Sequence, residues 1–179
     1  QVRSQYAVMK CSIVIRAYNE AEHLGRLFEG IRSQTMNDFE VILVDSGSRD
    51  TTVEIAERNG ARVVHIAPGE FSFGRSLNLG VASARGEFIV IASAHVRPVY
   101  PDWLECLLRP LADKDVAVAY GKQRGTPSSH FSEHQIFRQW FPEEDVPRQS
   151  SPFCNNANAA IRRRLWEQHA YDEELTGLE

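Results

Sequence analysis

The segment Val41-Ile42-Leu43-Val44-Asp45-Ser46-Gly47-Ser48 joins an apolar run to a short polar turn. Four consecutive aliphatic residues are typical of a strand covered on both faces, as in parallel sheets. The Thr51-x-x-Glu54 pattern that follows fits the capping box of a helix. We therefore predict a strand over Glu40–Asp45 and a helix that begins near Thr51 and ends before Gly60. An acid at the carboxyl end of such a strand lies where open α/β sheets bind nucleotides.

The same pattern of an apolar run, a turn and a helix occurs before this segment and again after it. Cys11-Ser12-Ile13-Val14-Ile15 leads into the polar turn Arg16-Ala17-Tyr18-Asn19-Glu20. Strands that alternate with helical periodicity indicate βαβ units and a parallel sheet. The fold class predicted is α/β, with a mostly parallel central sheet and helices on both faces. Further strands are expected at Cys11–Arg16, Arg62–Ile66 and Phe88–Ala92. Further helices are expected from about Ala21, with Leu24, Leu27, Phe28 and Ile31 on one face, and after Pro68-Gly69 to about Ala84.

The pattern becomes less regular after Pro98 and Pro101. From Gly121 to Pro152 the chain is polar, apart from an aromatic stretch between Ile136 and Phe141. This part is either a mobile loop or a partly helical excursion. The other elements expected here are a helix over Asp102–Leu108, strands over Val116–Tyr120 and Asn155–Ile161, and a helix over Arg163–His169.

The bulk composition limits the class of protein. With 179 residues, 42% of them hydrophobic and 25% charged, the chain fits one domain with a sizeable core. A net charge of −4 provides no global basic field for nucleic acid. No apolar run reaches the roughly 20 residues that a membrane span needs, and no apolar signal region begins the chain. We therefore expect a cytoplasmic setting, at the inner face of a membrane in a longer protein.

Three cysteines and the end of the chain also carry information. Cys11, Cys106 and Cys154 are widely spaced and form neither a disulfide framework nor a CxxC motif, so we expect reduced thiols. The sequence stops without a closing element, which predicts a single domain over 1–179 that is truncated at its C-terminus. Within it we expect a nucleotide-binding part over about 11–100 and an acceptor-side part over about 101–179.

Several motifs in order resemble those of the family 2 glycosyltransferases, inverting enzymes with the GT-A fold. Ser12–Glu20 resembles the family's opening motif, which usually has Pro where Arg16 stands. Val44–Thr51 resembles the second motif, often written with another Asp where Ser46 stands. Its Asp-Ser-Gly-Ser form is similar to that of bacterial rhamnosyltransferase-like members. The remaining matches are Phe73–Gly80 and the lead-in Ala84–Glu87 to the central strand.

The resemblance implies a nucleotide-diphosphate sugar donor at the carboxyl edge of the sheet. Asp45 is the candidate for the base or ribose, with a turn acceptor or helix cap as the alternative. Glu20 would line the other side of the nucleoside, or serve only as an acid at the start of a helix. Asn78 would brace the donor site, or tie loops together. The nucleotide-binding residues predicted in this way are Ala17, Tyr18, Glu20, Asp45, Ser46, Asn78, Ser93 and Ala94.

The sharpest departure from the family follows the central strand. The family's Asp-x-Asp motif binds Mg²⁺ or Mn²⁺, which neutralises the diphosphate leaving group, but the aligned residues here are Ser93-Ala94-His95. The resemblance implies a divalent cation, Mn²⁺ or Mg²⁺, with His95 as a metal ligand. His95 could instead contact the diphosphate directly when protonated, or be structural. Arg97 is a second diphosphate candidate because a guanidinium matches phosphate geometry, unless it is only a surface side chain.

The catalytic base and the acceptor site are expected near the C-terminus. Inverting transfer needs a carboxylate that removes the proton of the acceptor hydroxyl. Tyr171–Glu179 resembles the approach to the family's acidic pair, and Glu179 matches its first acid. The base would be the next residue, so we expect this chain to bind a donor better than it catalyses.

The segment Phe153–Arg162 resembles the family strand that lines the acceptor site. Asn156 and Asn158 are the acceptor candidates, with an Asn-rich turn as the alternative. Trp140 and Phe141 would stack on a sugar or act as hydrophobic anchors.

The sequence therefore predicts a glycosyltransferase domain that moves a hexosyl or deoxyhexosyl group from a nucleotide-diphosphate sugar. The acceptor expected is a hydroxyl of a glycan or lipid-linked glycan in cell-envelope or polysaccharide biosynthesis. One rival is a non-catalytic nucleotide-sugar binding module. Another is a nucleotidyltransferase, which would need a Gly- and Lys-rich loop where this chain has Arg16–Glu20.

Overall fold

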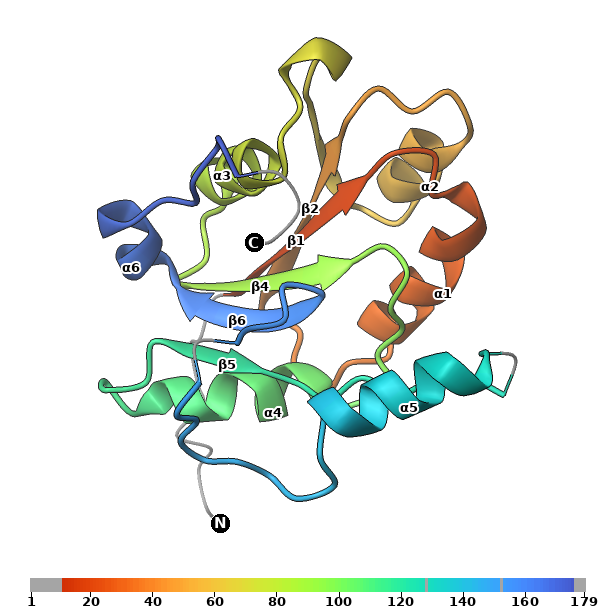
Figure 1. Cartoon of the computed structure of the whole chain (residues 1–179). Helices are drawn as coiled ribbons and strands as arrows, with labels where there is room; N and C mark the ends of the chain where they lie inside the picture. The colour runs from red at the N-terminus through yellow and green to blue at the C-terminus, as the bar shows by residue number, and fades with distance from the viewer. Residues whose placement is uncertain (1–10, 128, 152, 176–179) are drawn as a thin grey trace.

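A computed structural model describes residues 11–127, 129–151 and 153–175 of the chain (Figure 1). Within these residues, six strands form a single sheet with helices on both sides, which confirms the predicted fold class. The strands are β1 (Cys11–Ala17), β2 (Phe39–Asp45), β3 (Arg62–His65), β4 (Phe88–Ser93), β5 (Val118–Tyr120) and β6 (Asn158–Arg162). The helices are α1 (Ala21–Arg32), α2 (Thr52–Arg58), α3 (Phe73–Ser83), α4 (Trp103–Leu108), α5 (Phe131–Trp140) and α6 (Arg163–Gln168), with 3₁₀ turns η1 (Pro68–Glu70) and η2 (Arg109–Ala112).

The strand order is β3-β2-β1-β4-β6-β5. The pairs β1–β2, β2–β3 and β1–β4 are parallel, whereas β6 runs antiparallel to both β4 and β5. The chain proceeds outward from β1 to β2 and β3, and then returns to place β4 on the other side of β1. This reversal makes the space between the carboxyl ends of β1 and β4 a topological switch point, where open α/β sheets bind ligands.

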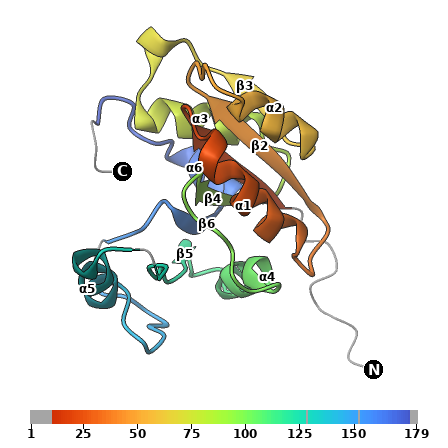
Figure 2. The same cartoon turned by 90° about the vertical axis from the view of Figure 1, so that its right-hand side faces the viewer.

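Alternate residues of the central strands face two different helical layers. Ile13 and Ile15 of β1 belong to the core cluster that includes α1 and α4 residues, and Val14 belongs to the cluster that includes α3 residues. Figure 2, turned so that α1 lies in front, shows α3 behind the sheet. Burial on both faces explains why β1, β2 and β4 read as continuous apolar runs. The predicted inner face of α1 is also confirmed, since Leu24, Leu27, Phe28 and Ile31 are buried.

The helix α2 starts where predicted, but its cap differs from the prediction. The helix begins at Thr52, and the N-cap residue Thr51 forms no side-chain capping hydrogen bond. Instead, the Asp50 carboxylate accepts a hydrogen bond from the Thr52 N–H at 3.0 Å. The capping box predicted from Thr51 and Glu54 is therefore wrong, and the side-chain acceptor at this helix start is the Asp50 carboxylate, one residue before the N-cap.

The polar stretch from Gly121 to Pro152 contains a helix, α5, so the partly helical alternative is correct. None of the α5 residues is buried, and in Figure 2 the helix lies beyond β5, apart from α1 and α3. Phe141, directly after the helix, is 2% exposed and packs against Tyr120 and Phe153. This aromatic contact anchors α5 to the rest of the domain.

Two further sequence expectations concern thiols and membranes. The three cysteines are free, as predicted, with Cys11 buried and Cys106 exposed. Burial raises the pKa of the Cys11 thiol far above its ordinary value. Among the described residues, none of the helices has the length and apolar character that crossing a bilayer requires.

Candidate functional site

The polar residues that follow β1, β2 and β4 meet at one edge of the sheet. In the strand register, Ala17 lies beside Asp45, and Arg16 lies beside Ser93. The parallel strands β1, β2 and β4 therefore end at the same edge of the sheet, where the loops that follow them begin (Figure 1).

Asp45 shapes the loop after β2. Its side chain is buried, and its carboxylate accepts hydrogen bonds from the N–H groups of Gly47 at 3.1 Å and Ser48 at 3.2 Å. Gly47 has φ +91°, a left-handed conformation that suits glycine. His65 lies 3.4 Å from the same carboxylate. The structure thus gives Asp45 the turn-acceptor role, and its contact with a base or ribose stays a prediction.

The loops after β1 and β2 are tied to each other. The Asn19 N–H donates to the Ser48 hydroxyl at 2.9 Å, and the Arg49 N–H donates to the Asn19 side-chain oxygen at 2.8 Å. Asn19 has φ +56°, which Asn tolerates better than most residues. These reciprocal bonds hold the two loops in one arrangement relative to each other.

A second connection fixes the start of α1. The Glu20 N–H donates to the Thr52 hydroxyl at 2.7 Å, and that hydroxyl donates to the Asp50 carboxylate at 2.5 Å. The Asp50 carboxylate also accepts from the Ala21 N–H at 3.2 Å. The Thr52 hydroxyl hydrogen bond, together with these backbone donors, lowers the pKa of Asp50 below its ordinary value. The N–H groups of Glu20 and Ala21 are therefore both bonded to side chains at the start of α2, which fixes the backbone where α1 begins.

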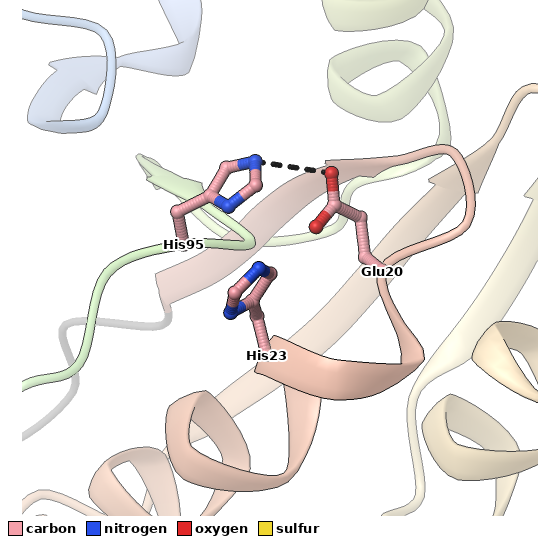
Figure 3. Close-up of side chains that lie close together, drawn as sticks. All are labelled: Glu20, His23 and His95. Carbon is pink, nitrogen blue, oxygen red and sulfur yellow. Dashed lines mark ion pairs between the residues drawn. The ribbon is translucent and has the colours of Figure 1, made fainter.

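Glu20, His23 and His95 converge above the switch point (Figure 3). His95 Nε2 lies 3.1 Å from Glu20 Oε1, and the rings of His23 and His95 have centroids 4.7 Å apart. Within the part of the chain that the structure describes, these are the only three His, Cys, Asp or Glu side chains whose ligand atoms all lie within 4.8 Å of one another. Carboxylate and imidazole donors at this spacing could hold a divalent cation.

Sequence reasoning singled out Glu20 and His95 but missed His23. A usable signal was present, because Glu20-x-x-His23 has the i,i+3 spacing that places two side chains on one helix face. That signal gains meaning only when His95, 75 positions further along than Glu20 in the chain, is brought beside it by the pairing of β1 and β4.

The other predicted donor-site residues lie around this cluster in different environments. Tyr18 is 54% exposed at the loop surface, whereas Ala17, Ser46 and Ala94 are buried. The Ser93 hydroxyl accepts from the His95 N–H at 3.3 Å and so shapes the turn after β4. Arg97 is exposed. Their contacts with a nucleotide stay predictions.

Asn78 has a different role from nucleotide binding. Its side-chain oxygen accepts from Trp166 Nε1 at 2.8 Å and from the Tyr171 N–H at 3.0 Å. Its amide nitrogen donates to the Tyr171 carbonyl and to Glu173, each at 2.9 Å. All the hydrogen-bonding capacity of the amide is thus taken by protein groups. The prediction of a nucleotide contact is revised accordingly, and Asn78 ties the segment after α6 to α3.

The two residues predicted to contact the acceptor, Asn156 and Asn158, lie in different environments. Asn158 is 9% exposed within β6, and its side-chain oxygen accepts from Trp103 Nε1 at 2.8 Å. This buried contact makes Asn158 a link between β6 and α4, and its contact with acceptor hydroxyls stays a prediction. Asn156 is half-buried in the turn before β6, where its acceptor role stays a prediction. Glu179 lies outside the described residues.

Comparison with known proteins agrees with this architecture. The sequence model of glycosyl transferase family 2 matches residues 12–169, so the chain belongs to that family. It is 32% identical over 108 residues to the putative glycosyltransferase EpsH of Bacillus subtilis, covering 58% of this chain and 30% of EpsH. It is likewise 32% identical over 115 residues to the glycosyltransferase GlyG of Streptococcus pneumoniae, covering 62% and 38%. The chain thus spans about a third of the length of these relatives.

Solved structures share the fold. The mannosyltransferase PcManGT from Pyrobaculum calidifontis, in complex with GDP-Man and Mn²⁺, superimposes with a TM-score of 0.72 at 21% identity over 93% of this chain and 48% of its own. S. aureus TarS 1–349 in complex with UDP-GlcNAc gives a TM-score of 0.68 at 20% identity, covering 93% and 50%. The GT-A fold predicted from the motifs is therefore confirmed.

Proposed function

We propose that this domain binds a nucleotide-diphosphate sugar across the carboxyl ends of β1, β2 and β4, and transfers the sugar with inversion. The observation that carries the proposal is the preformed pair of loops after β1 and β2, locked by Asn19 and Ser48 in a chain of this family. Because these loops need no further ordering, little conformational entropy is lost when a nucleoside enters between them. The complexes of PcManGT with GDP-Man and of TarS with UDP-GlcNAc support this class of donor.

Within the proposed site, the nucleoside lies against Tyr18 and the Asp45 turn, and the diphosphate lies toward His95 and Arg97. A divalent cation held near His95 would supply positive charge for the departing diphosphate. The presence of Mn²⁺ in the PcManGT complex supports a cation of this kind. The cluster fits such an ion because it offers one carboxylate and two imidazoles on a largely fixed loop.

The acceptor side is proposed to lie toward the turn before β6, where Asn156 is half-buried. The acceptor is a hydroxyl of a glycan or a lipid-linked glycan, in envelope or polysaccharide biosynthesis. Direct displacement requires a carboxylate base that takes the hydroxyl proton while the nucleotide leaves from the opposite face. That base is proposed to belong to the family's acidic pair, whose first member Glu179 matches.

Calorimetric titration with UDP, GDP, CDP and dTDP, each with Mn²⁺, with Mg²⁺ and with a chelator, tests the donor site. We expect one nucleotide to bind preferentially, and Tyr18→Ala to weaken it about 3- to 10-fold through the loss of an aromatic contact. The matched control is Phe131→Ala, which removes a 79% exposed aromatic side chain from α5 and should leave the affinity unchanged. Absence of binding under every condition would overturn the proposal.

A non-catalytic binding module remains the second candidate, because Ser93 and His95 stand where the family has two acids. An assay of the full-length protein for sugar transfer from its preferred donor distinguishes a transferase from a binding module. Donor binding without turnover, also in that longer protein, would favour the binding module.

A further inference from the structure

We infer that Glu20, His23 and His95 together form a binding site for a divalent transition metal, selective for ions such as Mn²⁺ or Zn²⁺ over Mg²⁺. The family resemblance pointed only to the position of His95. The side-chain arrangement in Figure 3 adds His23 to the site. It also gives the site a mixed set of nitrogen and oxygen donors, where the family's Asp-x-Asp motif offers oxygen alone.

The spacing of the donor atoms is close to what one ion requires. Metal–nitrogen and metal–oxygen bonds of about 2.1 Å place neighbouring donors about 3.0–3.4 Å apart. Glu20 Oε1 and His95 Nε2 already meet this condition at 3.1 Å. With all three donors within 4.8 Å, His23 needs only a modest side-chain rotation to complete the set.

The support of the site is stiffer than that of an ordinary surface ion pair. The Glu20 side chain is 16% exposed, and its backbone N–H is held by the Thr52 hydroxyl. The Glu20 side chain does not cap α1, and Figure 3 shows its carboxylate turned toward the two histidines. His23 lies in the first turn of α1, three residues on, and β4 fixes the start of the turn that carries His95. Preorganised ligands lose little side-chain entropy when an ion binds.

The chemistry of the donors determines which ion is preferred. Imidazole nitrogen suits Mn²⁺, Zn²⁺ and other transition metals, whereas Mg²⁺ prefers oxygen ligands and gives up its water reluctantly. Two imidazole rings with centroids 4.7 Å apart can direct nitrogen lone pairs at one cation, and the single carboxylate offsets part of its charge.

The position of the site connects it to the donor. It lies at the switch point between β1 and β4, and three protein ligands leave coordination positions open for further oxygens. That these positions receive the donor diphosphate rests on the proposed function. Metal binding itself requires only the three side chains.

Metal titration of the chain without nucleotide provides the test. Calorimetry with MnCl₂, ZnCl₂ and MgCl₂ should show the first two ions binding at least about tenfold more tightly than Mg²⁺. Co²⁺ serves as a spectroscopic probe, because its visible absorption changes when nitrogen ligands bind. His23→Ala and Glu20→Gln should each weaken Mn²⁺ binding about tenfold or more and alter the Co²⁺ spectrum.

The control is His169→Ala, which removes an exposed histidine outside the cluster and should change neither readout. Equal affinity for Mg²⁺ and Mn²⁺, or unchanged binding in His23→Ala, would overturn the inference. Nucleotide binding that is unaffected by chelator, with no metal bound, would remove the metal site but leave the proposed donor site intact. Metal binding without nucleotide binding would do the reverse.

Discussion

The central strands and the α5 region of this domain are built in opposite ways. In β4, five of six residues are buried, and helices cover both faces of the strand. In α5, ten residues long, none is buried, and attachment depends on Phe141 at its end. A strand buried on both sides is therefore fixed by many contacts at once, whereas α5 depends on a few.

The loops repeat this contrast. Those after β1 and β2 hold each other through side-chain and backbone hydrogen bonds, among them the reciprocal bonds of Asn19. The segment before β6 is connected mainly by aromatic contacts between Tyr120, Phe141 and Phe153. The proposed donor side is therefore preformed, while the proposed acceptor side is more loosely fixed.

The largest expected effect compares the same residue type in both regions. Ile91→Ala in β4 removes a side chain that is 1% exposed and leaves a cavity, so the free energy of unfolding should fall by about 2–5 kcal/mol. Ile136→Ala in α5, at a site 44% exposed, should cost less than about 1 kcal/mol. Urea unfolding measures both. Similar losses for the two variants would show that α5 is part of the main cooperative core.

A smaller effect is expected where the C-terminal segment joins the core. Asn78→Ala deletes the hydrogen bonds to Trp166, Tyr171 and Glu173, and should lower the free energy of unfolding by about 1–3 kcal/mol. Cleavage by a protease within residues 170–175 should also become faster, because their attachment to α3 is lost. Asn156→Ala, in the turn before β6, is the control and should not change that rate. A variant as resistant as the parent chain would contradict the bracing role.

The smallest effect concerns the amino edge of the sheet. Burial opposes ionisation of Glu40, but hydrogen bonds from the Ser12 hydroxyl, the Arg85 N–H and Arg62 outweigh it and lower the pKa of this carboxyl below its ordinary 4.5. A lowered folded-state pKa means that the stabilisation is present above about pH 4.5 and is lost as pH falls through the folded-state pKa.

Glu40→Gln should therefore flatten the loss of stability between about pH 5 and pH 3, with a change below about 1 kcal/mol because the pair with Arg62 is partly exposed. Thermal melts across that range measure it, with Glu54→Gln on the exposed face of α2 as the control. An identical acid slope in the parent chain and in Glu40→Gln would contradict this account.

The strands and most helices could be predicted because local patterns and tertiary packing agree there. The run Val41–Val44 is apolar throughout because both faces are covered, and Leu24, Leu27 and Phe28 repeat at helical spacing because α1 covers one face. The capping box at Thr51 is absent, and Asp50 is the side-chain acceptor at this helix start instead. A pattern of residue types does not show this, because the Asp50 carboxylate also accepts from Ala21, which lies far away in the sequence.

The candidate site was predicted in part for a similar reason. Asp45, Glu20 and His95 follow strand ends, so their shared location follows from the parallel sheet. His23, Asn78 and Asn158 depend on partners from 55 to 95 positions away in the chain, such as Trp103 for Asn158 and Glu173 for Asn78. Contacts between residues so far apart in the chain produce no periodic pattern in the sequence.

By itself, the sequence determined the α/β class, the family and the edge of the sheet that carries polar residues. These follow from hydrophobic periodicity and from ordered motifs, which are local properties of the chain. Only the tertiary structure decided that His23 joins Glu20 and His95, and that Asn78 braces the segment after α6. The physical reason is that ligand sets and hydrogen-bond partners are fixed by distances between atoms, and strand pairing sets those distances across gaps that sequence order does not encode.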